Sequence, residues 1–345
     1  MEYFVLAAIP CQQYHKEYLE QTGREKCRFV FYPELYGNWP ETKTEEDILK
    51  RFPDKPKEWV KGLCKDFMQV DIIIGEPPLS LVKELPHLKW IQMTWAGTDI
   101  YTAKEKLMGQ KFPEAVKLTN MSGAYGTIIA EYVMGAVLYF YRNFNQYTGF
   151  REQALWQKGR SEESLEGKNV LILGAGDIGT QTAKRMQAFG AYVVGFRRNI
   201  VDKPPYFDEI CGQMGFREQL KKADVIIGCL PNSSATAGMI GKNELESMKK
   251  NAVFINVGRG NLVKTEELVE VLRAGHLRGV GLDVTDPEPL PKNHPLWKEE
   301  RVLITPHVAG VGFGHCKNTE DKIIRICGEN MIRFVEGRNL RNEIR

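Results

Sequence analysis

The sequence predicts an α/β protein of two domains, each built on parallel strands, with the second domain inserted into the first. Three observations lead to this prediction. Apolar, strand-like runs alternate with helical patterns along the chain, a glycine turn directly follows one of these runs near the middle, and an amphipathic helix follows the last run. Alternating strands and helices of this kind are typical of parallel sheets with helices on both faces.

Length and composition agree with a globular protein of this class. The 345 residues suffice for roughly two domains of ordinary size, and 43% hydrophobic residues provide a core. The 47 basic and 44 acidic side chains nearly balance, at a net charge of +3, so the charge favours neither nucleic acid nor an anionic membrane as a partner.

The cysteines and the N-terminus predict a cytoplasmic protein. Seven cysteines are scattered without a C-x-x-C pair, which favours free thiols in a reducing compartment over a disulfide framework or a zinc site, and we expect no metal. Residues 1–4 lack the basic region of a signal peptide. The most apolar run, 128–140, is shorter than the roughly 20 residues that a membrane helix needs.

The first domain alternates expected strands with helices. Its expected strands are the runs Tyr3–Ile9, Cys27–Tyr32, Val70–Gly75, Leu88–Met93 and Leu118–Ser122. Helices are expected at 12–21 and 59–67, because apolar residues recur there at helical spacing. The polar, proline-marked stretch 38–56 is expected to be mostly loop, with at most one helical turn.

The glycine turn is the most informative stretch. The apolar run Val170–Leu173 breaks into Gly174-x-Gly176-x-x-Gly179, and a helical pattern up to Phe189 follows. In a strand–turn–helix context this spacing is typical of dinucleotide binding. The first glycine allows the tight turn, the second lets backbone approach a pyrophosphate, and the third lets helix and strand pack closely. The helix N-terminus then offers N–H groups to the phosphates.

The second domain continues with a six-strand cadence. The expected strands are Val170–Leu173, Tyr192–Phe196, Val225–Cys229, Val253–Val257, Val280–Val284 and Val302–Thr305. Helices are expected at 242–249 and at 266–274, the latter with Thr265 as its N-cap. Six parallel strands suit a full dinucleotide fold, whose ligand lies at the carboxyl ends of the strands.

The domain boundaries follow from the flanking helices. An apolar helix over 128–143 reads as an interdomain linker, a buried core helix or a dimer surface, and these three interpretations do not exclude one another. Residues 310–314 form a glycine-rich hinge before a final helix over 318–336, which is free to return to the first domain. We therefore expect 1–123 with 316–345 as one domain and 124–315 as the other.

Three polar residues follow the late strands of the second domain. Arg259, Glu288 and His307 each lie just after the carboxyl end of an expected strand. Each alone is more often a solvated charge, a turn residue or a structural histidine. Because the carboxyl ends of parallel strands face one crevice, all three together after a dinucleotide turn favour a catalytic site.

At these motifs the chain resembles the D-isomer-specific 2-hydroxyacid dehydrogenases, and the resemblance extends over nearly its whole length. Its most specific parts are Gly174–Gly179, Asn256-Val-Gly-Arg259-Gly, Asp283 through Glu288-Pro-Leu-Pro, and His307-x-Ala-Gly310. Residues 120–131 and 88–99 look like the family's linker helix and substrate loop. The resemblance implies two Rossmann-like domains, the nucleotide-binding one inserted into a discontinuous, flavodoxin-like substrate domain.

The resemblance also implies an activity, the reversible reduction of a small 2-oxoacid to the D-2-hydroxyacid. His307 suits the acid that protonates the carbonyl oxygen, Glu288 would favour its imidazolium form, and the donor fork of Arg259 can bind carboxylate and carbonyl oxygens. Backbone N–H groups of Ala96 and Gly97 are implied to hold the substrate carboxylate, beside the bulky Trp95.

The expected cofactor contacts include the turn, two further strand ends and the residues after them. They are Gly174, Gly176, Asp177, Ile178, Gly179, Arg197, Arg198, Leu230, Pro231, Val257, Gly258, Asp283 and Gly310, with Asp283 near the nicotinamide carboxamide. Arg197 stands 18 residues after Gly179, where NAD-preferring folds carry an acid that accepts from the ribose 2′-OH. Two arginines there predict that NADP(H) is preferred, with NAD(H) possible. A solvated basic strand end is the alternative.

Rival functions remain at this point. An NAD-linked dehydrogenase of the same fold is one, and a dinucleotide-sensing corepressor, a binding module without turnover, is another. Formate-type members carry a neutral amide where this chain has Glu288, and the chain lacks the length after His307 for a phosphoglycerate-type regulatory tail. Gly312 departs from the family, many members of which carry a hydroxyl residue there. The resemblance implies a homodimer, through the nucleotide domain and the helix at 128–143.

Overall fold

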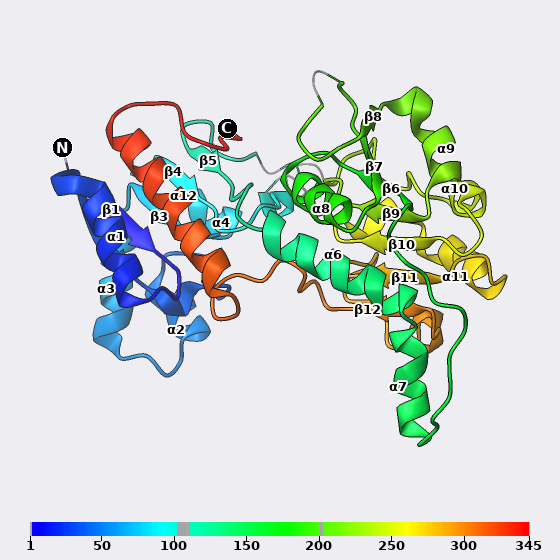
Figure 1. The fold of residues 1–345 in the computed structure, drawn as a ribbon. Helices are drawn as coiled ribbons and strands as arrows, with labels where there is room; N and C mark the ends of the chain where they lie inside the picture. The colour runs from blue at the N-terminus through cyan, green and yellow to red at the C-terminus, as the bar shows by residue number, and fades with distance from the viewer. Residues whose placement is uncertain (1, 102–108, 110, 201–202, 345) are drawn as a thin grey trace. The chain divides into compact units, whose positions relative to one another are not determined.

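The computed structural model describes residues 2–101, 109, 111–200 and 203–344. Contacts divide the chain into two compact units (Figure 1), one formed by Met1–Tyr125 with Val311–Arg345 and the other by Gly126–Gly310. Each unit is an α/β structure around a sheet whose strand pairs are parallel. The predicted fold class, with one unit inserted into the chain of the other, is confirmed.

The first unit holds a five-stranded sheet in the order β2-β1-β3-β4-β5. Its strands are β1 (Tyr3–Ala7), β2 (Cys27–Phe31), β3 (Ile72–Ile74), β4 (Trp90–Gln92) and β5 (Lys117–Thr119). Its main helices are α1 (Gln13–Gly23), α2 (Glu45–Arg51), α3 (Lys57–Phe67), α4 (Leu79–Val82) and α12 (Lys317–Val335). Each strand overlaps the apolar run expected to form it.

The C-terminal helix α12 belongs to the first unit, as its amphipathic pattern predicts. It packs against α1, and its Phe334 ring lies 5.2 Å from Tyr3 and 5.1 Å from Trp90, measured between ring centroids. The buried amide of Asn330 donates to Gln92 Oε1 at 2.8 Å. Contacts with β1 and β4 therefore tie the end of the chain to the first sheet.

Residues 38–56 are mostly loop, as predicted, but α2 is longer than the single helical turn expected there. This helix has seven residues, and the side chain of Thr44 caps it by accepting from Asp47 N. Three acidic residues occupy its first turn, where they favour the positive end of the helix dipole. Its one buried residue is Ile48. A single buried position gives no helical period, so the sequence did not reveal the helix.

The second unit holds a seven-stranded sheet in the order β12-β11-β10-β9-β6-β7-β8. Its strands are β6 (Asn169–Leu173), β7 (Tyr192–Phe196), β8 (Glu209–Cys211), β9 (Val225–Gly228), β10 (Val253–Asn256), β11 (Gly279–Leu282) and β12 (Val302–Ile304). Its helices include α6 (Gly126–Tyr141), α7 (Phe144–Glu152), α8 (Asp177–Ala188), α9 (Gln213–Lys222), α10 (Lys242–Ser247) and α11 (Thr265–Arg273). The chain reverses its direction of travel across the sheet between β6 and β9, which is the switch point where such sheets bind ligands.

Three details of the second unit differ from expectation. The sheet has a seventh strand, β8, a three-residue edge strand that is too short and too polar to be seen as an apolar run. Helix α7 was not expected, because none of its residues is buried. Lys264, not Thr265, is the N-cap of α11, since the Thr265 hydroxyl donates to Asp286 O instead.

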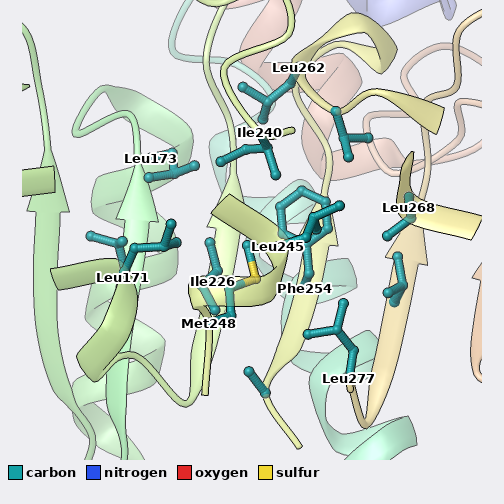
Figure 2. Close-up of a cluster of buried hydrophobic side chains, with 14 of the residues drawn as sticks. Leu171, Leu173, Ile226, Ile240, Leu245, Met248, Phe254, Leu262, Leu268 and Leu277 are labelled. Carbon is teal, nitrogen blue, oxygen red and sulfur yellow. The ribbon is translucent and has the colours of Figure 1, made fainter. Parts of the chain in front are cut away.

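A single apolar cluster fills one face of the seven-stranded sheet. Figure 2 shows Leu171, Ile226 and Phe254 on neighbouring strands, in one cluster with Leu245 of α10, Met248 at the end of that helix and Leu268 of α11. All of these side chains are buried. Burial at roughly 25 cal/mol per Å² of apolar surface makes such a cluster the main stabilising contribution of the unit.

Helix α6 lies against the same sheet, and Gly279 of β11 makes room for it. A Cβ added at Gly279 would overlap the ring of Phe140 on α6, whereas one at Gly281 would lie 2.7 Å from Ile255 Cδ1 of the neighbouring strand β10. The buried Arg278 guanidinium closes the end of the helix by donating to Phe140 O and Tyr141 O. Of the three interpretations of this segment, the structure shows a largely buried core helix.

The units change at 125/126 and 310/311, a few residues from the expected boundaries at 123/124 and 315/316. The Tyr125 hydroxyl donates to Thr94 O in the first unit, whereas Gly126 N donates to Asp177 in the second. On the return, Phe313 packs edge-on against Tyr36 of the first unit. The contacts of Tyr125 and Phe313 therefore stay within the first unit, and that of Gly126 stays within the second.

Among the described residues, no helix combines the length and the apolar character needed to cross a bilayer.

The glycines of the α6 interface lead to a stability prediction. Gly279→Ala should lower the free energy of unfolding by about 1–3 kcal/mol, because the rigid, fully buried Phe140 ring must move. Gly135→Ala is the matched control, since Gly135 is exposed on α6 with no atom within 4 Å of an added Cβ. It should raise stability by up to about 1 kcal/mol through helix propensity. Denaturant unfolding of both variants checks this, and equal effects of the two substitutions would contradict it.

Candidate active site

The glycine turn links β6 to α8, and each glycine has a separate steric reason. Gly174 has φ +114°, and an added Cβ would lie 3.0 Å from Cys229 O on the neighbouring strand. A Cβ at Gly179 would overlap Gly174 O, so the turn closes tightly on the helix. Gly176 is exposed, with no atom within 4 Å of an added Cβ. The turn thus presents bare backbone and a helix N-terminus, which fits a diphosphate.

Asp177 and Ile178 begin α8. The carboxylate of Asp177 accepts from Gly126 N at 3.0 Å, which joins the start of α6 to the turn. This contact gives the side chain a structural role, and it leaves the first N–H groups of α8 as the polar groups that face outward from the turn. Ile178 is half-buried beside them.

The loops after β9 and β10 touch each other through their backbones. A Cβ at Gly258 would lie 2.7 Å from Leu230 O, so only glycine allows this approach. Thr236 donates to Pro231 O at 2.7 Å, and Val257 is buried at the end of β10. The two loops that carry the expected cofactor residues Leu230, Pro231, Val257 and Gly258 are therefore in direct backbone contact.

Arg259 follows directly on β10. Its backbone is held by Asn256, whose side chain donates to Arg259 O at 2.9 Å and accepts from Gly258 N at 3.2 Å. One guanidinium nitrogen, Nη1, donates to Gly258 O at 2.8 Å. The side chain is half-buried, and its guanidinium carries N–H donors in a planar fork, the geometry that suits a carboxylate.

His307 and Glu288 form a hydrogen-bonded pair after the neighbouring strands β12 and β11. His307 Nδ1 lies 2.7 Å from Glu288 Oε1, and the two side chains are 49% and 43% exposed. The carboxylate engages Nδ1, so Nε2 is the ring nitrogen that can exchange a proton with a ligand. A histidine with one ring nitrogen on a carboxylate has the geometry expected of a general acid that the carboxylate orients.

Asp283 holds the backbone on which His307 stands. Its buried carboxylate accepts from Thr305 Oγ1 at 2.6 Å, Val308 N at 2.8 Å and Ala309 N at 3.0 Å. Its carbonyl accepts from His307 N at 2.9 Å. These bonds enclose His307, whose φ of +56° is uncommon for a residue with a Cβ. The expected nicotinamide contact of Asp283 is not tested by this geometry, and the positioning of the histidine loop is an additional role that the sequence did not reveal.

Arg197 and Arg198 lie at the end of β7. The N–H of Arg197 donates to Cys211 O of β8 at 3.1 Å, so the unexpected edge strand fixes the backbone there. The Arg197 side chain is half-buried and that of Arg198 is exposed. The strand end next to the glycine turn is therefore positively charged.

The expected substrate loop lies after β4 in the first unit. Trp95 is 41% exposed, Ala96 is exposed and Gly97 is half-buried. The buried Glu76 binds the start of this loop, because its Oε1 accepts from the N–H and the hydroxyl of Thr94. The sequence alone did not single out Glu76. The only signal in the sequence was the position of Glu76 directly after an apolar strand.

The structure thus brings the glycine turn, Leu230–Pro231, Val257–Arg259, Asp283, Glu288 and His307 to one edge of the seven-stranded sheet. Gly310 is the last residue of that unit. Trp95, Ala96 and Gly97 belong to the first unit.

Comparisons with known proteins were made for the whole chain. Residues 134–309 match the family model described as D-isomer specific 2-hydroxyacid dehydrogenase, NAD binding domain. A protein named glyoxylate/hydroxypyruvate reductase A, from Salmonella typhimurium (strain LT2), is 31% identical over 240 residues, which cover 69% of this chain and 76% of that protein.

Solved structures show the same fold. The similar structures include a D-isomer specific 2-hydroxyacid dehydrogenase family protein from Aeromonas salmonicida, 27% identical with a TM-score of 0.80, covering 100% of this chain and 99% of that one. An NADPH-dependent glyoxylate/hydroxypyruvate reductase from Sinorhizobium meliloti, 20% identical with a TM-score of 0.75, covers 99% and 98% of the two chains. The motifs, the sheet order and these matches agree, and the chain belongs to the D-isomer-specific 2-hydroxyacid dehydrogenase family as an NAD(P)-dependent oxidoreductase.

Proposed function

We propose that the protein reduces a small 2-oxoacid, such as glyoxylate or hydroxypyruvate, to the D-2-hydroxyacid with NADP(H) as the preferred coenzyme. The observation that carries this proposal is the His307–Glu288 pair on the same sheet edge as Arg259 and the glycine turn. The reductases from Salmonella typhimurium and Sinorhizobium meliloti, which carry such substrates in their names, support it.

In this proposal each residue has one task in the reduction. Arg259 binds the carbonyl oxygen and a carboxylate oxygen, and its charge stabilises the alkoxide that develops. His307 Nε2 gives its proton to that oxygen, while Glu288 keeps the ring oriented through Nδ1. Ala96 and Gly97 donate backbone N–H groups to the substrate carboxylate, and Trp95 lies beside its side chain.

The coenzyme would be held by the turn Gly174–Gly179 with Asp177 and Ile178, by Leu230, Pro231, Val257 and Gly258, and by Asp283 and Gly310. The open backbone at Gly176 and the N-terminus of α8 fit its diphosphate. When bound, the reduced nicotinamide supplies the hydride to the carbonyl carbon. After that transfer His307 is neutral, and it is ready to accept a proton in the reverse direction.

The preference for NADP(H) is proposed from Arg197 and Arg198. Guanidinium groups donate to a phosphate and cannot accept from a ribose hydroxyl, so a 2′-phosphate suits this strand end better than a free 2′-OH. The half-buried Arg197, anchored by β8 through its backbone, is the better placed of the two for a defined contact.

A homodimer is proposed from apolar surface on the second unit. Helix α7 and the segment after it stand away from the sheet of that unit (Figure 1). Phe144, Leu155 and Trp156 are 53%, 45% and fully exposed there. Large exposed apolar side chains close together are typical of an interface. We propose that a second copy of this chain covers them.

The catalytic proposal predicts the behaviour of His307→Ala. Its kcat for reduction should fall by about three decades, because proton transfer by a positioned side chain typically accelerates a reaction 10²–10⁴-fold. The affinity for NADPH should stay the same. The measurement is NADPH oxidation with a panel of 2-oxoacids, with direct coenzyme titration as the control. Near-normal turnover would refute the acid role, and no oxidation of NADPH by the unmodified protein with any 2-oxoacid would favour the corepressor-like binding module.

The coenzyme proposal predicts a switch in Arg197→Asp. The ratio of kcat/KM for NADPH to that for NADH should fall by about 10–100-fold, the value of one lost charge-assisted hydrogen bond. Arg217→Asp, an exposed site on α9, is the matched charge-reversal control and should leave the ratio unchanged. If the unmodified protein is equally efficient with NADH, or if Arg197→Asp keeps its selectivity, the proposal is wrong.

The dimer proposal predicts that Trp156→Asp weakens association, because a charge would be buried in the interface. Sedimentation velocity should show a dimer for the unmodified protein and a shift towards monomer for the variant. Met214→Asp, at another fully exposed apolar side chain of the same unit, is the control and should remain dimeric. A monomer at every concentration of the unmodified protein would exclude this assembly.

A further inference from the structure

Glu76 is a buried carboxyl that the reduction does not use. It follows β3 directly, is 5% exposed, and receives three donors from one loop. The Thr94 N–H and hydroxyl donate to its Oε1, the hydroxyl at 2.9 Å, and the Trp95 N–H is a third donor to the carboxyl. A carboxyl in such a place costs free energy unless its bonds repay the loss of water.

The carbonyls of the same loop are all held on the opposite side. Thr94 O accepts from the Tyr125 hydroxyl at 2.7 Å, Trp95 O from Met121 N at 3.0 Å, and Ala96 O from the Asn120 side chain at 2.7 Å. In a planar trans peptide the C=O and the next N–H point in opposite directions. Fixing the carbonyls of Trp95 and Ala96 therefore fixes the N–H directions of Ala96 and Gly97.

Glu76 completes this arrangement. Its carboxyl accepts from the N–H groups of Thr94 and Trp95, the two that precede Ala96. The carbonyls of Thr94 and Trp95 are bound by Tyr125 and Met121. The next two N–H groups are those proposed above to bind the substrate carboxylate. We propose that Glu76 is a positioning residue for substrate, whose ionised carboxylate orders the loop Thr94–Gly97 and whose protonation loosens it. This inference rests on the proposed reduction of a 2-oxoacid.

The numbers of donors and acceptors show which protonation state of Glu76 orders the loop better. An ionised carboxylate accepts all three loop donors at once. A protonated carboxyl turns one oxygen into a donor that faces other donors, so at least one loop bond weakens. Ordering of the loop, and with it the affinity for a 2-oxoacid, should therefore be greater above the pKa of Glu76 than below it.

Glu76 titrates in an accessible range. Burial raises its pKa to about 7, and the bonds from Thr94 and Trp95 lower it towards that value. Its titratable neighbours come from several elements of the unit, namely Tyr36, Tyr101, Tyr125 and Cys327, and each is neutral near pH 7 because its own pKa is raised. None of these described neighbours is a cation that would keep Glu76 charged in acid.

The experiment compares KM for glyoxylate between variant and unmodified protein, with saturating NADPH, from about pH 5.5 to about pH 8.5, a range on both sides of neutrality. The ratio of the two KM values cancels every pH effect that the variant and the unmodified protein share. For Glu76→Gln the ratio should be close to one in acid and rise about tenfold on the alkaline side, the value of lost charge assistance. For Glu76→Ala the ratio should be raised at every pH. KM for NADPH should not change in either variant.

Two further variants keep the test informative if Glu76→Ala does not fold. Thr94→Val removes one donor to the ionised form, so its pH dependence of KM should move to higher pH. Glu84→Gln is the matched control, because its carboxylate accepts from Lys43 N in the same unit and has no bond to the loop, and its ratio should be flat.

The outcomes separate the two proposals. Turnover by the unmodified protein with a flat Glu76→Gln ratio, or with a ratio that falls as pH rises, overturns the role of Glu76 and leaves the reduction intact. No turnover with any 2-oxoacid overturns both.

Discussion

Close backbone contact between neighbouring strand-end loops is the constraint on which the catalytic edge of the second unit depends. Gly174 lies against the backbone at Cys229, Gly258 against Leu230, and Gly260 against Thr285, where in each case a side chain would collide with main-chain atoms. The loops after β6, β9, β10 and β11 therefore form one layer without intervening side chains. A ligand on this layer meets backbone donors and the few side chains, such as Arg259, that rise from it.

Hydrogen bonds within the strand-end loops also determine the position of His307. His307 takes a left-handed backbone conformation, which costs free energy for a residue with a Cβ, so the surrounding bonds must hold it there. The buried Asp283 carboxylate supplies them by accepting from residues on both sides of His307. Tyr132 of α6 extends this set, since its hydroxyl lies 2.6 Å from Thr305 Oγ1, the group that donates to Asp283. The long apolar helix thus supports the histidine loop as well as the core.

The sequence predicted the parts that depend on local rules. Apolar runs located every strand of both sheets except β8, and glycine spacing located the turn, because a left-handed φ or a close approach demands glycine whatever the rest of the chain does. It could not reveal β8 or α7, whose residues bury too little apolar surface to leave a period. Nor could it reveal Glu76 or the bonds of Asp283, because a buried carboxylate is defined by donors that are distant along the chain.

The two buried carboxyl groups, Asp283 and Glu76, differ in a way that affects the pH dependence of the protein. Asp283 accepts from groups that hold the histidine loop in place, whereas Glu76 accepts from Thr94 and has a pKa raised to about 7 by burial. If Glu76 orders the substrate loop, reduction needs this carboxyl ionised, and acid then weakens the binding of a 2-oxoacid. A loop carboxyl of this kind would therefore narrow the pH range of reduction from the acid side.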